Sequence, residues 1–69
     1  MRQVTHALYQ SDYDAGYQAM QDKISRQGFK SARDEFNALC PPGVKQSASM
    51  PDYYRMTGGV DALLNALPN

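Results

Sequence analysis

The stretch Ser11–Phe29, SDYDAGYQAMQDKISRQGF, decides the fold, because it holds a helix start, an apolar stripe and a helix stop in one segment. Ser11 can cap the first turn with its hydroxyl, and Asp14, three residues later, completes a capping box. Apolar residues then recur at spacings of four, three and four, which is the period of one helix face. Gly28 can take the left-handed conformation that closes a helix, with Phe29 folding back onto the last turn. The stripe consists of Tyr13, Tyr17, Met20 and Ile24.

A second, shorter helix is predicted directly after this stop. Ser31 and Asp34 repeat the capping spacing, and Phe36 and Leu39 follow at helical intervals. The helix must end near Leu39, since Pro41-Pro42-Gly43 follows at once and a residue before proline disfavours helical geometry. The two helices and the short turn at Gly28 predict a helix-turn-helix-like corner.

A third helix is predicted after residues 43–49, which form a small, polar loop. Ser49 with Asp52 supplies a third capping pair, and Pro51 suits a first helical turn. The apolar face is formed by Tyr53, Met56, Val60, Leu63 and Leu67. Gly58-Gly59 interrupts this face and predicts a kink or a break, because each glycine costs about 1 kcal/mol relative to alanine inside a helix. Pro68 is expected to end the helix.

Within residues 1–10, Val4, His6 and Leu8 alternate with Thr5, Ala7 and Tyr9, which favours a short extended arm over a helix. A lone strand must pair, and with no second strand in the chain the nearest candidate is the same segment of a second copy. The alternative is a frayed terminus.

The chain has 69 residues, which predicts a single domain over 1–69 with a thin core. A core of this size supplies on the order of 3–5 kcal/mol, so small domains usually add disulfides, a metal or a second subunit. One cysteine, Cys40, and one histidine, His6, exclude an internal disulfide and a closed zinc site. We therefore expect a homodimer with no metal and no cofactor. No apolar run approaches the ~20 residues that span a membrane, which favours a cytoplasmic location without membrane contact.

The formal net charge is zero, but four cations gather between two acidic flanks. This basic band consists of Lys23, Arg26, Lys30 and Arg33. It can contact nucleic-acid phosphates or an acidic protein surface, or it can be a solvated face paired with Asp22, Asp34 and Glu35. Two of these acids lie on the helix that would read DNA, which argues against nucleic acid as the partner.

Tyrosine is the other unusual feature, with five in the chain and two adjacent, Tyr53 and Tyr54. Adjacent helix residues point about 100° apart, so if Tyr53 joins the core stripe, Tyr54 faces elsewhere. Tyrosine and arginine are enriched at binding hot spots. The pair Tyr54-Arg55 is therefore the best candidate for a partner contact, with packing in a dimer as the alternative.

Candidates for catalysis are few. Cys40 and His6 are the sole thiol and imidazole, and no third group orients them. Asp12 and Asp14 both fall in the first turn of a helix, where capping and the helix dipole explain them. Gly58-Gly59 lacks the lysine of a phosphate-binding loop. We predict no catalytic residues and no enzyme.

The layout, with stretches such as DAGYQAMQDKISRQGFKSARDEF and MPDYYRMTGGVDALLNALPN, resembles the small early-region proteins of temperate phages that take over host regulators. Among these it looks like the anti-activators of quorum sensing. The resemblance implies a homodimer in the host cytoplasm that binds a LuxR-type transcriptional activator and blocks its DNA binding, with possible action on the type IV pilus assembly ATPase. AGYQAM and the later CPP also resemble ribosome modulation factor, but the chain lacks that family's tryptophans and strongly basic charge.

Together these observations predict an all-α domain of three short helices that dimerises and inhibits a host protein stoichiometrically. The alternative is a small helix-turn-helix DNA-binding phage regulator. The residues predicted for partner binding are Lys23, Arg26, Lys30, Arg33, Tyr54 and Arg55. The residues predicted for the core or a dimer face are Tyr13, Tyr17, Met20, Ile24, Phe29, Phe36, Leu39, Tyr53, Met56, Val60, Leu63 and Leu67.

Overall fold

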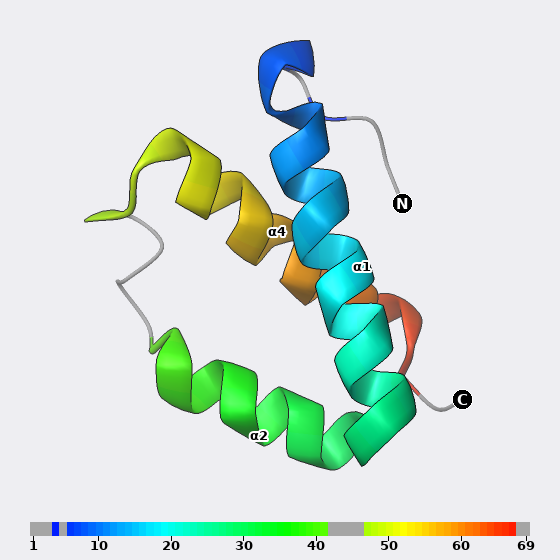
Figure 1. Ribbon diagram of the computed structural model, residues 1–69. Helices are drawn as coiled ribbons and strands as arrows, with labels where there is room; N and C mark the ends of the chain where they lie inside the picture. The colour runs from blue at the N-terminus through cyan, green and yellow to red at the C-terminus, as the bar shows by residue number, and fades with distance from the viewer. Residues whose placement is uncertain (1–3, 5, 42–46, 68–69) are drawn as a thin grey trace.

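A computed structural model describes residues 4, 6–41 and 47–67 of the chain. Within them a short 3-10 helix, η1 (Ala7–Tyr9), leads into α1 (Gln10–Gln27), followed by α2 (Phe29–Leu39) and α4 (Met50–Asn65) (Figure 1). These residues contain three α-helices and no strand, so the all-α prediction is confirmed. None of the helices in these ranges combines the length and apolarity that crossing a membrane requires.

The fold is built on a close crossing of α1 and α4, in which α4 passes behind α1 (Figure 1). Glycines allow the two backbones to touch. A Cβ atom at Gly16 would overlap the carbonyl oxygen of Arg55, and one at Gly58 would overlap the carbonyl oxygen of Tyr13. Any side chain at either position would force the helices apart.

The predicted break at Gly58-Gly59 is wrong, since α4 runs through both glycines without interruption. Both are buried at the helix crossing. Glycine weakens an isolated helix, but here it permits contacts that a larger residue would prevent, and tertiary packing overrides propensity.

The core lies where the three helices meet. Tyr13, Tyr17 and Met20 of α1 are buried as predicted, and Ile24 packs against them half-buried. The core is completed by Ala32, Ala62 and Leu63. Both buried phenols have partners: the Tyr13 hydroxyl donates to Asp61 Oδ2 (2.6 Å), and Asn65 Nδ2 donates to the Tyr17 oxygen (2.7 Å). These bonds tie α1 to α4 and satisfy groups that would otherwise be costly to bury.

Gly28 alone separates α1 from α2, with φ 90° and ψ 156°. The predicted positive φ is confirmed, although ψ is extended rather than left-handed helical. Its N–H donates to the Ile24 carbonyl (2.9 Å), and its own carbonyl accepts from Ala32 (3.0 Å). One residue therefore ends one helix and starts the next.

Two of the three predicted helix caps are wrong. α1 begins at Gln10 rather than after Ser11, and Asp14 accepts a hydrogen bond from Gln10 Nε2 (2.8 Å) instead of completing a capping box. α2 begins at Phe29, so Ser31 lies inside the helix. Ser49 does occupy the N-cap of α4, with proline in the first turn, but without a side-chain capping bond.

The predicted extended arm is wrong over residues 7–10, which are helical. Val4 packs against the core, and its N–H donates to Gln10 Oε1 (2.8 Å). Residues 1–3 and 5 lie outside the described residues, as do residues 43–46 of the predicted loop and Pro68. α4 ends at Asn65, before the proline, and α2 ends at Leu39 as predicted.

The apolar face predicted for α4 is displaced from the one that packs. Of its five members, Leu63 is buried, Met56 and Val60 are half-buried, and Tyr53 and Leu67 are exposed. The face that meets α1 is formed instead by Tyr54, Gly58 and Ala62, at intervals of four residues. Two of these three residues, Gly58 and Ala62, are small, so a pattern of large apolar residues does not reveal the face.

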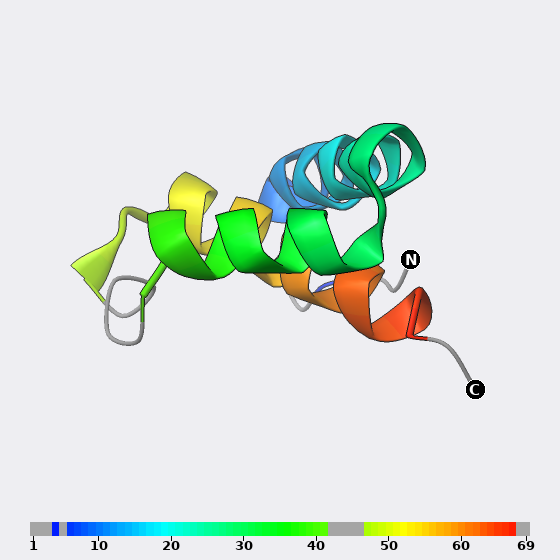
Figure 2. The same cartoon turned by 90° about the horizontal axis from the view of Figure 1, so that it is seen from below.

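α2 runs along one side of the α1–α4 pair and has the lightest attachment of the three helices (Figures 1 and 2). Ala32 is its one buried residue, while Phe29 and Phe36, both predicted for the core, pack half-buried. Leu39, also predicted for the core or a dimer face, is 67% exposed at the end of the helix. A core role for Leu39 within one chain is therefore excluded.

Candidate functional site

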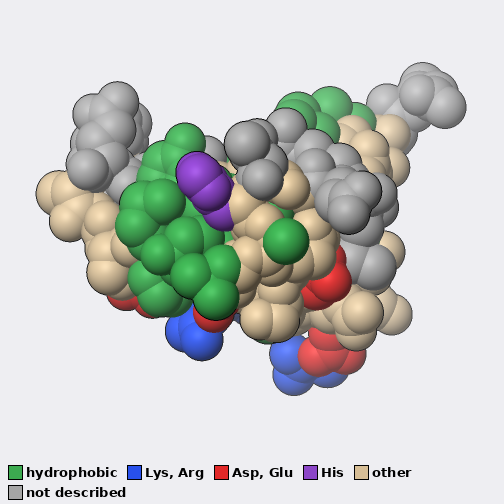
Figure 3. All heavy atoms as spheres, turned by 90° about the horizontal axis from the view of Figure 1, so that it is seen from above, with side chains coloured by type: hydrophobic (Ala, Val, Ile, Leu, Met, Phe, Trp, Pro, Cys, Tyr) green, Lys and Arg blue, Asp and Glu red, His purple; other side chains and the backbone are tan. Residues whose placement is uncertain are grey.

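A patch of aromatic side chains covers the end of the molecule where η1 and the first turns of α4 meet. We define this aromatic patch as the contacting rings of His6, Tyr9, Tyr53 and Tyr54, together with Leu8, which precedes Tyr9 in η1. Residues almost 50 positions apart are brought together by the α1–α4 crossing, which places the start of α1 against the start of α4. Seen from this end, hydrophobic side chains gather along one side of the chain's single histidine (Figure 3).

Each ring of the aromatic patch contacts the next, from His6 through Tyr9 and Tyr54 to Tyr53. Tyr9 stacks on Tyr54 with centroids 5.1 Å apart and planes 8° from parallel. Tyr53 meets Tyr54 edge-on at 5.4 Å, and His6 meets Tyr9 edge-on at 6.4 Å. Offset stacks and edge-to-face pairs at these distances are the favourable arrangements of aromatic rings. The patch is therefore held in a defined shape before any partner arrives.

Much of the aromatic patch faces solvent. Leu8 is 79% exposed, Tyr53 is 36% exposed and His6 is exposed, while Tyr9 and Tyr54 are half-buried. Exposed apolar clusters on small domains commonly mark binding surfaces, and tyrosine provides large contact area at low entropic cost. This surface is the strongest candidate for contact with another macromolecule.

The predicted placement of the two adjacent tyrosines is reversed. Tyr54 packs against the core and stacks on Tyr9, whereas Tyr53 faces outward. The reason is the displaced face of α4, which turns Tyr54 toward α1. Both residues remain in the aromatic patch, but Tyr53 is the one available for contact.

Arg55, the other half of the predicted Tyr54-Arg55 contact, bridges the two crossing helices. Its guanidinium lies 3.4 Å from Asp12 of α1 and 3.8 Å from Asp52 of α4. More than half of the Arg55 side chain is exposed, so the pairs are screened by water and contribute little to stability. Asp12 is thus explained by an ion pair.

Each cation of the basic band lies beside a carboxylate. The four pairs are Lys23–Glu35 (2.8 Å), Arg26–Asp22 (3.0 Å), Arg33–Asp34 (3.2 Å) and Lys30–Asp34 (3.9 Å). This is the solvated, paired face named as the alternative in the sequence analysis, and it involves the same three acids. The band therefore presents alternating charges instead of a positive stripe.

The Glu35 carboxylate is bonded to side chains of a different helix. It accepts hydrogen bonds from Gln27 Nε2 (2.8 Å) and Lys23 Nζ (2.8 Å), both on α1. The hydrogen bond from Gln27, followed by the hydrogen bond and charge of Lys23, lowers the pKa of Glu35 below its ordinary value. This carboxylate links α2 to α1 across the exposed side of their junction.

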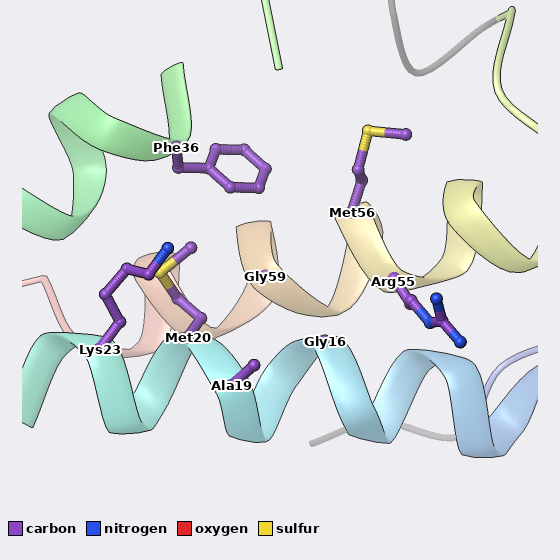
Figure 4. A pocket seen from close by; sticks show the side chains of 8 residues that line it. All are labelled: Gly16, Ala19, Met20, Lys23, Phe36, Arg55, Met56 and Gly59. Carbon is purple, nitrogen blue, oxygen red and sulfur yellow. The ribbon is translucent and has the colours of Figure 1, made fainter. Parts of the chain in front are cut away.

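A shallow apolar hollow lies between α1, α2 and α4 (Figure 4). Phe36 and Met56 border it, Gly16 and Gly59 form part of its floor, and Lys23 lies at its rim. It encloses about 220 Å³, enough for one side chain rather than a metabolite. Its lining holds no carboxylate, thiol or imidazole, and its charged groups are Lys23 and Arg55, both of which lie beside carboxylates.

The side chains considered for catalysis have no shared site. Cys40 follows α2 beside Ser47, Ala48 and Met56, whereas His6 lies in the aromatic patch. Asp14 bonds to Gln10. Over residues 4, 6–41 and 47–67, no three His, Cys, Asp or Glu side chains gather to hold a metal ion.

No protein-family model, curated protein or solved structure matches the chain.

The contribution of residues 6–9 to the candidate site does not follow from their sequence pattern, because that pattern predicts an extended segment. The signal in the sequence is the presence of two short segments of large apolar and aromatic residues, Leu8-Tyr9 and Tyr53-Tyr54, in a chain of only 69 residues. An aromatic residue with no place in a helical stripe is a reasonable candidate for a surface cluster.

Proposed function

We propose that the chain is a non-catalytic protein-binding domain that inhibits a host regulatory protein by covering its working surface. The observation that carries this proposal is the aromatic patch, in which Leu8 and Tyr53 are exposed and the rings of Tyr9 and Tyr54 are stacked. A rigid apolar and tyrosine surface is suited to burying a partner's side chains with little loss of conformational entropy.

The resemblance to phage anti-activators suggests the target. On that basis we propose a LuxR-type quorum-sensing activator, bound so that it cannot engage DNA, and the type IV pilus assembly ATPase as a further target. The setting would be the cytoplasm of the host cell. Inhibition of this kind follows mass action, so the chain must exceed its target in concentration or bind it tightly.

We propose that the active form is a homodimer. Exposed leucines outside the aromatic patch, Leu39, Leu64 and Leu67, supply apolar surface that a second copy would cover. A dimer would also compensate for a core that buries few large side chains.

The alternative, a helix-turn-helix DNA-binding regulator, has less support. A single residue joins α1 to α2, whereas DNA-binding motifs use a turn of about three to four residues. Every cation of the basic band also has a carboxylate within 4.0 Å, which weakens attraction to phosphates.

The decisive experiment measures binding of the chain to a purified LuxR-type activator by calorimetry. The variant combines Leu8→Ala with Tyr53→Ala, which removes exposed contact area while leaving Tyr9 and Tyr54 in place. We expect affinity to fall by about tenfold or more, as for loss of interface hot spots. Gln18→Ala is the control, because Gln18 is exposed on α1 and belongs neither to the aromatic patch nor to the exposed leucines of the proposed dimer face.

Each part of the proposal can fail separately. No binding of the activator by the parent chain would refute the target, and equal binding by the double variant would refute the surface. A mobility shift of random duplex DNA at low salt, lost steeply as salt rises, would favour the DNA-binding regulator.

A further inference from the structure

The attachment of α2 differs from that of the other helices. α1 and α4 touch backbone to backbone and share two buried phenol hydrogen bonds, from Tyr13 to Asp61 and from Asn65 to Tyr17. α2 buries a single residue, Ala32, and its two phenylalanines are half-buried. Far less apolar area thus holds α2 than holds the pair, and regions with few buried contacts open at lower free energy.

The connection to α1 is suited to movement. Gly28 stands alone between the helices at φ 90° and ψ 156°, a region that is essentially restricted to glycine, and a Cβ atom added there would lie more than 4 Å from any residue other than its chain neighbours. The N–H of Gly28 bonds toward α1 and its carbonyl bonds toward α2, so rotation about this residue changes the direction of α2 without breaking either bond. On its other side, ten chain positions, 40–49, separate α2 from α4.

A polar clamp closes the junction on its exposed side. Glu35 of α2 accepts hydrogen bonds from Lys23 and Gln27 of α1, and Gln27 Nε2 also lies 3.2 Å from the Ser31 hydroxyl. By contrast, the neighbouring Asp34 pairs only with cations of its own helix, Lys30 and Arg33, among the pairs found. Of these two adjacent carboxylates, Glu35 is the one whose partners lie across the junction.

On the buried side, the side chain of Phe36 completes the contact. Phe36 projects from α2 over Gly59, where an added Cβ atom would lie 3.2 Å from its ring (Figure 4). Met20 borders the same hollow. Movement of α2 away from the pair would uncover this apolar floor, so the closed position is favoured by one aromatic contact and the clamp.

We propose that α2 is a hinged arm that opens as a unit about Gly28 while the α1–α4 pair stays folded, with the bonds of Glu35 to Lys23 and Gln27 holding it closed. Opening exposes the floor formed by Gly59 and Met20. The arm is a conformational device that is separate from the aromatic patch at the opposite end of α1.

Amide hydrogen exchange followed by NMR tests this proposal. In the parent chain, we expect α2 amides to exchange faster than the core amides of α1 and α4. Glu35→Ala removes the clamp and should speed α2 exchange by about fivefold, the range of a few polar surface interactions. Asp34→Ala removes the same charge from the same helix and should change α2 exchange by less than about twofold.

Three results would overturn the proposal. Equal protection of α2 and the pair in the parent chain would show that the domain opens only as a whole. Equal acceleration by Glu35→Ala and Asp34→Ala would show that the bonds across the junction are not a clamp. Acceleration of all three helices by Glu35→Ala would show that the clamp supports the whole fold.

Discussion

Individual glycines determine how closely this molecule packs. The sequence gives no direct sign of this, because glycine in a helical pattern normally indicates weakness. Gly16 and Gly58 are required by neighbouring backbone, which cannot move aside, whereas Gly59 faces the ring of Phe36, which can. A side chain at Gly16 or Gly58 should therefore disturb the helix crossing, whereas one at Gly59 should be tolerated.

We expect Gly58→Ala to lower the free energy of unfolding by about 3 kcal/mol, as for overpacking against backbone. Gly59→Ala is the matched variant one residue away. It should change stability by less than about 1 kcal/mol, because a small shift of the Phe36 ring offsets the crowding and alanine favours the helix. Urea unfolding followed by circular dichroism compares the two, and equal effects would contradict the crossing at Gly58.

For the secondary-structure elements, the sequence predicts which helices form better than it predicts where they start and which face packs. The three helices, the stop at Leu39 and the buried stripe of Tyr13, Tyr17 and Met20 follow from periodicity and from proline and glycine signals. The starts of α1 and α2 do not, although that of α4 after Ser49 does, because capping residues compete with tertiary contacts that local sequence does not encode. The prediction of the packing face of α4 is wrong because two of its three residues, Gly58 and Ala62, are too small to mark an apolar stripe.

The junction between α1 and α2 depends on backbone geometry at one position. We expect Gly28→Ala to destabilise the domain by about 1–3 kcal/mol, because φ of 90° with extended ψ is strained for any residue with a Cβ atom. The space around Gly28 is open, so sterics with neighbours add nothing. Ser25→Ala, at an exposed position inside α1, is the control and should be neutral or slightly stabilising in thermal unfolding.

The clamp also predicts a pH dependence. Hydrogen bonds from Gln27 and Lys23 lower the pKa of Glu35 in the folded chain from an ordinary value of 4.5. A lowered folded pKa contributes stability that is fully present above the ordinary value and is lost as pH falls through the folded one.

Glu35→Ala should therefore reduce stability at neutral pH, and the difference from the parent chain should vanish at a pH well below 4.5. Urea unfolding at both pH values measures it. A difference that is the same in acid would mean that the lost contacts of Glu35 do not depend on its charge.

For the whole molecule, the sequence indicates a domain with little interior, and the described residues agree. Six hydrophobic residues form the buried core, two of them alanine. The surface left over has two kinds of apolar region, the aromatic patch at one end and exposed leucines elsewhere. The sequence does not distinguish these two regions, because α4 contributes apolar residues to both of them and to the core.

The two regions lead to different expectations for assembly. If the leucines form the dimer face, Leu64→Glu should convert a dimer to a monomer in sedimentation velocity at micromolar concentration, because a buried, unpaired carboxylate is costly. Leu8→Ala with Tyr53→Ala should leave the dimer intact, and helical circular dichroism confirms that both variants fold. If the aromatic variant alone dissociates the dimer, a second copy occupies the patch, and a regulator could bind there only in competition with self-association. Affinity for the regulator would then fall as the total concentration of the chain rises, which links the two measurements in a single titration.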